Sequence, residues 1–384
     1  MRRIRILSSA FVLASLPFSV NSEGLERFNI DPGFLFGEGN TANLSFASVS
    51  PSIGATSGSA LINLEDGLEV APSFSAVNLS VKSSLNEKID VGLFYTNSGN
   101  GVLIDWGTIS GPATSTNVTI GADLKMPTLA ALGKYKINDN ISLFGGLKRT
   151  TVNDGAYAKV ARDLDGNGTL DETSTWTLSE TSEMGMVYGA AYEMPEIALR
   201  VSLTIEDDIA LEIATVGTGV IPAATGTSNA SIGDAMTLHF QSGIAEDTLL
   251  FGSIRRSNWE DNQVSVPLSA IAQAASGGAT HAELSTFEDG TSYSLGIGRK
   301  INDELSLSIS AFYDGGDGTD TSELAPTGAN RSISFGGRYA MAENADLSGG
   351  INYSMRSDST TENLGAVLND SSVMTIGASI AFDF

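Results

Sequence analysis

Oxygen-bearing side chains recur at a fixed spacing between residues 163 and 171. With Asp163 as position 1 of a loop, Gly168 falls at position 6, where calcium loops need a sharp turn. Position 12 is Ser174 rather than the usual bidentate Glu, so Glu172 would have to substitute for tight binding. The spacing predicts a structural calcium ion that orders an external loop. The alternative is a turn rich in Asp, Asn and Gly that mimics such a site. The predicted ligands are Asp163, Asp165, Asn167, Thr169 and Asp171.

Elsewhere in the chain, few residues have side chains suited to catalysis. Enzymatic hydrolysis needs a nucleophile, a base and an orienting group held together. The sequence has no cysteine, no Gly-x-Ser-x-Gly motif and two histidines, His239 and His281. We therefore expect neither an enzyme nor a required cofactor. The formal net charge of −24 also argues against nucleic acid as a partner, because phosphates attract basic surfaces.

The elements that must position any site are β-strands. Residues 134–147 run into an Asn-Asp-Asn turn and leave it with apolar residues at every second position, the pattern of a hairpin. The pattern returns along the whole chain in runs as long as tilted membrane-crossing strands. It predicts about fourteen strands, at residues 42–50, 74–82, 88–96, 126–136, 140–150, 184–193, 196–205, 235–243, 248–256, 291–300, 304–314, 330–340, 345–355 and 373–383.

The connections between these strands alternate strictly between short turns and long segments. Short periplasmic turns and long external loops are typical of outer-membrane barrels. In the last strand, Met374, Ile376 and Ile380 share one face, whereas Thr375 and Ser379 lie on the other, as expected of a lipid face and a lumen face. We therefore predict an all-β fold, a transmembrane antiparallel β-barrel of about fourteen strands.

The first residues of the chain divide into two segments. Residues 1–22 begin with three arginines and continue with a short apolar run, which predicts a signal peptide. Residues 23–41 are apolar without a clean period, and we expect them to form a plug, or hatch, inside a barrel of residues 42–384. An irregular first strand or an external clamp is the alternative. Phe34 and Phe36 of this stretch are candidate contacts for an apolar cargo.

Strand alternation also predicts which cations face the lumen. Because Val201 and Leu203 take the lipid face, Arg200 points inward, and the same argument turns Arg338 and His239 inward. Lumen cations could orient a carboxylate on a cargo molecule. The alternative is ion pairing with lumen acids such as Glu206, and Lys148 and Arg356 face inward by the same parity.

Two segments between strands, residues 209–224 and 264–275, are unusually apolar for external loops. Exposed apolar surface usually marks a binding site, so they could form a groove that captures hydrophobic cargo. The alternative is that they pack on each other as a lid, with the second forming a short helix. The candidate groove residues are Ile213, Val220, Ile221, Leu268 and Ile271.

Four stretches make the chain resemble the long-chain fatty acid transporter (FadL) family of outer-membrane proteins. They are GLERFNIDPGFLFGEGNTANLSFASVSPSIGA, YKINDNISLFGGL, AAYEMPEIALRVSLT and HFQSGIAEDTLLFGSIR. The resemblance implies a fourteen-stranded barrel with an N-terminal hatch that takes up long-chain fatty acids or other hydrophobic molecules. The Asn-Pro-Ala signature that follows the hatch in many members is missing here.

The sequence thus predicts a monomer in the outer membrane of a Gram-negative bacterium. It would pass hydrophobic molecules by passive diffusion, gated by the hatch. Its expected partners are the cargo, outer-membrane lipid, lipopolysaccharide and the barrel assembly machinery. The alternatives are a general diffusion porin and a surface barrel that transports nothing.

Overall fold

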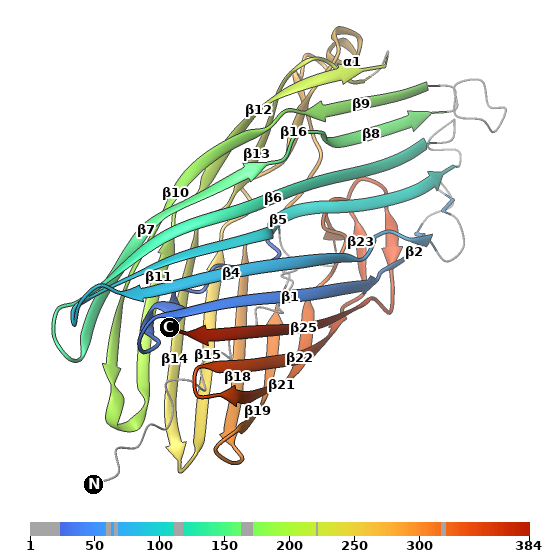
Figure 1. The fold of residues 1–384 in the computed structure, drawn as a ribbon. Coiled ribbons are helices and arrows are strands. Elements are labelled where there is room, and N and C mark those ends of the chain that lie inside the picture. The colour runs from blue at the N-terminus through green and yellow to red at the C-terminus, as the bar shows by residue number, and fades with distance from the viewer. Residues whose placement is uncertain are drawn as a thin grey trace.

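The fold is a closed antiparallel barrel (Figure 1). The computed structural model describes residues 24–58, 63–64, 68–110, 118–162, 172–219, 222–315 and 320–384. Within these residues fourteen strands form the wall. They are β1 (Thr41–Ser52), β4 (Phe74–Ser84), β5 (Ile89–Ile109), β6 (Val118–Lys136), β7 (Ile141–Val152), β10 (Thr181–Met194), β11 (Leu199–Glu206), β14 (Ala235–Ala245), β15 (Thr248–Ser257), β18 (Gly290–Lys300), β19 (Leu305–Asp314), β21 (Asn330–Ala342), β22 (Ala345–Arg356) and β25 (Ser372–Asp383). The predicted fold class and the fourteen strands are confirmed.

Closure depends on β1, which pairs with both β4 and β25. Leu44 lies opposite Leu79 on one side and Ile380 on the other, and each remaining wall strand pairs with its sequence neighbours. A closed sheet leaves no strand edge without hydrogen-bond partners, which a strand surrounded by lipid requires.

The two ends of the barrel differ. At one end, here called the short-turn end, the strands are joined by turns such as residues 137–140 and 301–304. The turn between β10 and β11 holds the 3-10 helix η3 (Pro195–Ile197). The C-terminus lies at this end (Figure 1), where the Phe384 amide donates to the Asn40 carbonyl at 3.0 Å. The opposite end, the loop end, carries the long connections.

The outside of the wall is an apolar belt. In β25, the outward side chains of Met374 and Ile376 are 45% and 52% exposed, whereas the inward Thr375 and Ser379 are buried. Other strands repeat this alternation, for example at Leu143 and Leu147 of β7. So much apolar surface around a whole barrel fits a lipid environment rather than water.

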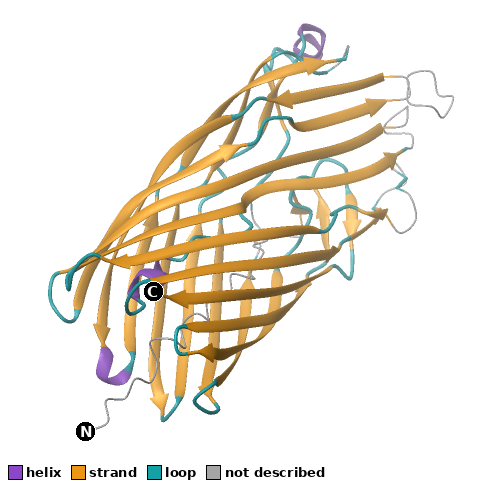
Figure 2. Cartoon of the chain, viewed as in Figure 1, coloured by secondary structure: helices purple, strands orange, loops and turns teal. Residues whose placement is uncertain are grey.

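At the loop end the sheet continues above the wall. Six further strands extend it, namely β8 (Ala156–Arg162), β9 (Glu172–Leu178), β12 (Ile209–Thr218), β13 (Gly226–Ile232), β16 (Ser265–Pro267) and β17 (His281–Glu283). A separate sheet is built from three loops, with β2 (Gly54–Ser57), β3 (Leu68–Glu69), β20 (Asp320–Thr321), β23 (Ser359–Thr361) and β24 (Ala366–Leu368). The helix α1 (Ala270–Ala275) lies at this end as well (Figure 2). No helix in the described ranges is long and apolar enough to cross a membrane.

The prediction of a loop over residues 209–224 is wrong for its first ten residues. These form β12, which continues β11 and pairs with β13 and β9. The apolar residues Ile209, Leu211 and Ile213 alternate with exposed ones and are buried. The stretch is apolar because one face packs in a core, and not because it offers apolar surface to a ligand. The predicted short helix in residues 264–275 is confirmed as α1.

Candidate functional site

Residues 24–40, here called the inner segment, contact inward-facing side chains of the wall. The segment contains the 3-10 helix η2 (Pro32–Phe36), which Asp31 caps by accepting a hydrogen bond from the Gly33 amide at 2.7 Å. Leu25 and Leu35 are fully buried. Leu35 packs with Phe94, Phe144 and other wall residues, so this part of the segment has its own apolar cluster.

The wall is interrupted where the inner segment meets β5. Pairing between β4 and β5 stops at Asn78 and Thr96, and the Asn97 Oδ1 then accepts from the Val77 amide at 2.8 Å. The Gly99 carbonyl accepts from the amides of Arg27 and Phe28 at 2.9 and 3.0 Å. A bulge in β5 between Thr96 and Asn100 therefore transfers its backbone hydrogen bonds from β4 to the inner segment.

Gly101 makes this transfer possible. Its φ of +144° lies outside the range that other residues adopt readily, and its amide donates to the Leu25 carbonyl at 2.7 Å. A Cβ at this position would lie 2.2 Å from the Leu124 carbonyl oxygen. The close approach of inner segment, β5 and β6 thus requires glycine.

A chain of buried charges connects the inner segment to three wall strands. Glu26 binds Arg255 of β15 through two contacts, Oε1 to Nη2 at 2.6 Å and Oε2 to Nε at 3.2 Å. The Arg255 Nη1 also donates to the Glu206 Oε1 at 2.8 Å, and the Lys148 Nζ donates to the Glu206 Oε2 at 2.7 Å. We call these four residues the ion-pair chain. All four side chains are at most 11% exposed, so each charge relies on its partners.

A second group of charges holds the other end of the segment. The Lys134 Nζ donates to the Leu35 carbonyl at 2.6 Å, and the Lys82 Nζ donates to the Gly39 carbonyl at 2.6 Å. Asp90 lies between the two ammonium groups, at 2.9 Å from Lys134 and 3.4 Å from Lys82. Two lysines and one aspartate therefore fix the end of the segment that leads into β1.

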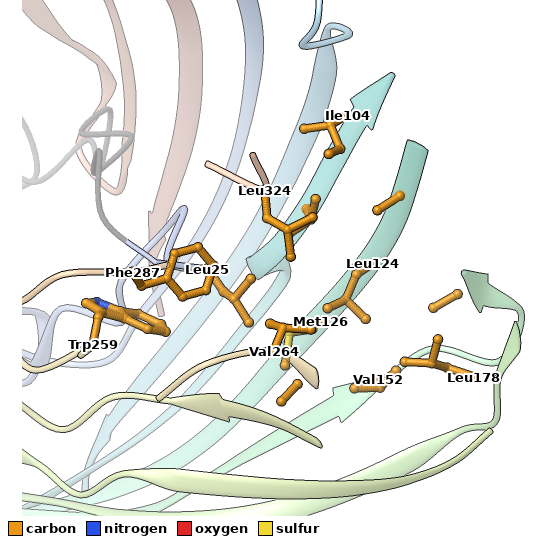
Figure 3. Close-up of a cluster of buried hydrophobic side chains, with 14 of the residues drawn as sticks. Leu25, Ile104, Leu124, Met126, Val152, Leu178, Trp259, Val264, Phe287 and Leu324 are labelled. Carbon is orange, nitrogen blue, oxygen red and sulfur yellow. The ribbon is translucent and has the colours of Figure 1, made fainter. Parts of the chain in front are cut away.

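Aromatic contacts complete the anchoring. Phe34 and Phe36 meet Phe94 and Phe144 edge to face, with centroids 6.0 and 5.8 Å apart. At the start of the segment, Gly24 lies against the Trp259 ring. Figure 3 shows the buried cluster in which Leu25 packs with Trp259, Phe287 and other apolar residues.

A cavity of about 100 Å³ lies between the inner segment and the wall, beside the interruption of the β4–β5 pairing. Its lining is largely apolar and includes two arginines, Arg27 and Arg356. The Arg27 guanidinium lies 4.4 Å from the Phe74 ring centroid. Burial lowers the pKa of Arg27 to about 10, against a smaller opposite effect of Asp123, so the group stays positive at neutral pH. The lining residues are Gly24, Glu26, Arg27, Val49, Pro51, Ile53, Ala71, Pro72, Phe74, Gly101, Val102, Leu103, Ile104, Leu324, Ala325, Pro326, Thr327, Arg356 and Val373.

Residues from the connection between β19 and β21 line part of this cavity. Residues 324–327 belong to the lining, and the neighbouring Glu323 carboxylate accepts from the amides of Asn363 and Leu364 at 2.7 and 3.0 Å. The Glu323 carbonyl accepts from the Trp106 Nε1 of β5 at 3.1 Å. These hydrogen bonds attach this part of the lining to β5 and to residues 363–364.

Among the cations that strand parity predicted to face the lumen, Arg356 lines the cavity, whereas Arg200, Arg338 and His239 lie away from it. The Arg200 guanidinium lies 4.6 Å from the Phe36 ring centroid, under the inner segment. Arg338 forms an ion pair with Asp346 near the short-turn end. His239 is half-buried and lies opposite Ser202 and Ser253. Phe34 and Phe36 pack on the wall and do not belong to the lining.

The candidate groove residues are only partly brought together. An isolated bridge joins Ala223 to Leu268, and the Ser269 amide donates to the Pro222 carbonyl at 2.8 Å, so the two segments do pack on each other. Ile213 lies in a separate buried core, and Ile271 is 59% exposed on α1. Val220 and Ile221 lie outside the described residues.

The predicted signal peptide and the calcium ligands Asp163, Asp165, Asn167, Thr169 and Asp171 also lie outside the described residues. Within the described ranges, no group of three or more His, Asp and Glu side chains is placed to hold a metal ion. The calcium site therefore stays a prediction from sequence.

Sequence reasoning missed Arg255, Arg27 and Asp90. The parity that turned Arg200 inward also applies to Arg255, because its neighbours Ile254 and Arg256 are exposed. The sequence does not indicate which way Arg27 points, because the apolar residues of the inner segment do not recur at a fixed spacing. Only its contacts in the folded chain place it at the cavity.

No model of a known protein family matches the sequence, and no curated protein matches it. Solved structures do match over nearly the full length. A Pseudomonas aeruginosa FadL homologue superimposes with a TM-score of 0.70 at 13% identity, covering 95% of this chain and 96% of that one. The chain has the fold of a FadL homologue.

Two toluene transporters share this FadL-type fold. TodX of Pseudomonas putida gives a TM-score of 0.63 at 15% identity, over 95% of this chain and 96% of that one. TbuX of Ralstonia pickettii gives 0.59 at 12% identity, over 97% and 100%. At such low identity the likeness establishes the architecture, and it leaves the cargo to be argued from this chain's own residues.

Proposed function

We propose that this protein is an outer-membrane channel of a Gram-negative bacterium that admits hydrophobic small molecules by passive diffusion. In this orientation the short-turn end faces the periplasm and the loop end faces the outside. The observation that carries the proposal is the largely apolar cavity between the inner segment and the wall. A barrel with an apolar belt outside and an apolar cavity inside suits cargo that dissolves poorly in water.

The inner segment is the hatch in this proposal. Small-molecule pockets usually measure about 300–1,000 Å³, and the cavity here measures about 100 Å³. A whole fatty acid therefore requires the inner segment to shift. Because β4 and β5 do not pair with each other beyond Asn78 and Thr96, cargo can leave either toward the short-turn end or sideways at this interruption.

Long-chain fatty acids are the cargo that the two arginines favour. Arg27 and Arg356 line the cavity together with apolar side chains, which fits a carboxylate joined to a hydrocarbon chain. Arg356 lies in a buried row with Asn330 and Asp314, so it already has polar surroundings. A carboxylate would have to share this arginine with them.

A small uncharged hydrocarbon is the second candidate cargo. Apolar cavities of about 150 Å³ hold benzene, so the cavity is closer in size to a single aromatic ring than to a fatty acid. TodX and TbuX are toluene transporters, which agrees with cargo of this size. A general porin is less well supported, because the inner segment occupies the lumen with apolar contacts.

The test is uptake of labelled long-chain fatty acid and labelled toluene by cells lacking their own transporter, with and without this chain. Arg27→Gln and Arg356→Gln should reduce fatty acid uptake and spare toluene uptake. Arg200→Gln and Arg338→Gln test the steering role that strand parity suggested. If the folded barrel in the outer membrane transports neither compound, the proposed function is wrong.

A further inference from the structure

The Arg255 guanidinium presents two different edges to its surroundings. Its Nη1 donates to the Glu206 Oε1 of β11 and to the Thr237 Oγ1 of β14, both at 2.8 Å. Its Nε–Nη2 edge faces the inner segment and binds the two carboxylate oxygens of Glu26 at 3.2 and 2.6 Å. The wall therefore holds the group through one edge. The other edge binds a carboxylate side by side, the geometry in which arginine recognises this group.

Glu26 contacts both this guanidinium and the cavity. Glu26 and its neighbour Arg27 belong to the lining of the cavity, whereas Arg255 does not. The Glu26 side chain is 8% exposed, and that of Arg255 is 11% exposed. A molecule in the cavity would therefore reach the Nε–Nη2 edge of Arg255 only after the Glu26 carboxylate has moved.

The chemistry of Glu26 is that of a fatty acid, a carboxylate at the end of an aliphatic stem. The ion-pair chain holds two cations, Lys148 and Arg255, and two anions, Glu206 and Glu26. If a cargo carboxylate replaced Glu26, the charges and the two hydrogen bonds at Arg255 would stay the same. An uncharged cargo would instead leave Arg255 with one buried anion fewer, which is costly. An acid can take this position, and a hydrocarbon or an alcohol cannot.

We propose that the Nε–Nη2 edge of Arg255 is a binding site for the carboxylate of a hydrocarbon-chain acid, and that Glu26 occupies it as a built-in competitor. The inference rests on the proposed function, because it takes the molecule in the cavity to be cargo. Arg27 and Arg356 receive the acid in the cavity, and Arg255 is a separate site behind Glu26. Because Glu26 joins the inner segment to β15, an acid that displaces it also loosens the segment and enlarges a cavity of about 100 Å³.

Equilibrium dialysis of labelled dodecanoate against the full barrel in non-ionic detergent tests the site. The second probe is 1-dodecanol, which has the same chain length and no charge. Glu26→Gln removes the competitor and leaves Arg255 in place, so this variant should bind dodecanoate about tenfold more tightly than wild type. Its affinity for 1-dodecanol should equal that of wild type. The matched control is Glu38→Gln, which removes an exposed acid of the same inner segment and should bind both probes as wild type does.

A double variant separates the contribution of Arg255 from a general loosening of the inner segment. Glu26→Gln combined with Arg255→Gln removes one anion and one cation, and it leaves the pair of Glu206 and Lys148 at 2.7 Å. This charge balance favours folding more than Arg255→Gln alone. The double variant should lose the gain and bind dodecanoate about tenfold more weakly than Glu26→Gln. Equal dodecanoate affinity of wild type and Glu26→Gln, or an equal gain in the double variant, would overturn the proposal.

Chymotrypsin cleavage within residues 24–40 measures whether the acid displaces Glu26. Dodecanoate should speed cleavage of the wild-type and Glu38→Gln barrels about tenfold, and 1-dodecanol should leave it unchanged. In Glu26→Gln, cleavage should already be fast and should not respond to dodecanoate. An equal response to both probes in the wild type would mean that the chain, and not the carboxylate, acts on the segment, which contradicts the proposal.

The outcome can be separated from a failure of the proposed function. If dodecanoate binds and is taken up but Glu26→Gln leaves its affinity unchanged, the Arg255 site is wrong and the fatty acid channel stands. If dodecanoate does not bind to any variant while toluene is taken up, the site is wrong and the channel carries hydrocarbons. If the folded barrel takes up neither compound, yet Glu26→Gln and the double variant differ as expected, the carboxylate site stands and the transport proposal falls.

Discussion

Glu26 and Arg255 form a two-point ion pair across 229 residues of sequence, with the shorter contact at 2.6 Å. Both side chains are buried, and Arg255 also binds Glu206, which in turn binds Lys148. The inner segment is thus tied to β15, β11 and β7 by one set of charges. A buried charge that loses its partner is costly, so this relationship decides how firmly the segment is held.

Replacing Arg255 by Gln should loosen the inner segment and destabilise the barrel. The change removes the Arg255 charge from both Glu26 and Glu206, at a cost of about 3–5 kcal/mol. We expect a lower unfolding temperature by gel mobility shift, faster protease cleavage within residues 24–40, and higher passive uptake. Glu26→Gln should speed the cleavage with less loss of stability, because Arg255 keeps Glu206. Unchanged cleavage in both variants would refute the anchoring role.

Gly24→Ala should displace the start of the inner segment. Gly24 has a φ of +62°, and a Cβ there would meet the Trp259 ring at 2.1–2.4 Å. The matched control is Gly39→Ala, where φ is +65° and nothing lies within 4 Å of the added Cβ. Both variants bear a backbone strain of about 1–2 kcal/mol, and the Gly24 variant adds the clash. Tryptophan fluorescence and protease cleavage should change in Gly24→Ala far more than in Gly39→Ala.

Asp90→Asn should release the end of the inner segment that leads into β1. Lys82 and Lys134 are 1% and 2% exposed and share this one acid, so its neutralisation removes the negative charge that both buried ammonium groups share. We expect a loss of about 3–5 kcal/mol in the free energy of unfolding, measured by urea titration in lipid vesicles. Asp303→Asn is the control, because the Asp303 side chain is 99% exposed beside Lys300 and should matter little. Equal effects of the two changes would argue against a buried anchor.

Ala71→Leu should narrow the cavity and slow uptake severalfold. Ala71 belongs to the lining, so a larger side chain there takes up part of the cavity volume. Ala275→Leu adds the same atoms at an exposed position of α1 and should leave uptake unchanged. The measurement is initial uptake rate per folded barrel. Normal rates in Ala71→Leu would mean that cargo bypasses this cavity.

The alternation of side chains along the chain was enough to predict the strands, their two faces and the cations that point inward. Alternation of side chains is a local property, so Met374 outside and Thr375 inside can be read without knowing any partner strand. The strict alternation of short and long connections likewise predicted closure. An apolar run such as residues 209–218 is compatible with either a loop or a strand, and the sequence alone predicts a loop here. The run forms a strand because it pairs with β9 and β13.

The contacts of the inner segment could be identified only in the folded chain. Its apolar residues follow no repeating spacing. The local sequence therefore does not predict that Glu26 pairs with Arg255 or that Arg27 lies at the cavity beside Phe74. The same holds for the transfer of β5 hydrogen bonds from β4 to residues 25–28, which depends on a bulge and on Gly101. Contacts between residues far apart in sequence arise from how the whole barrel closes around the segment, and this is the reason that the site required the structure.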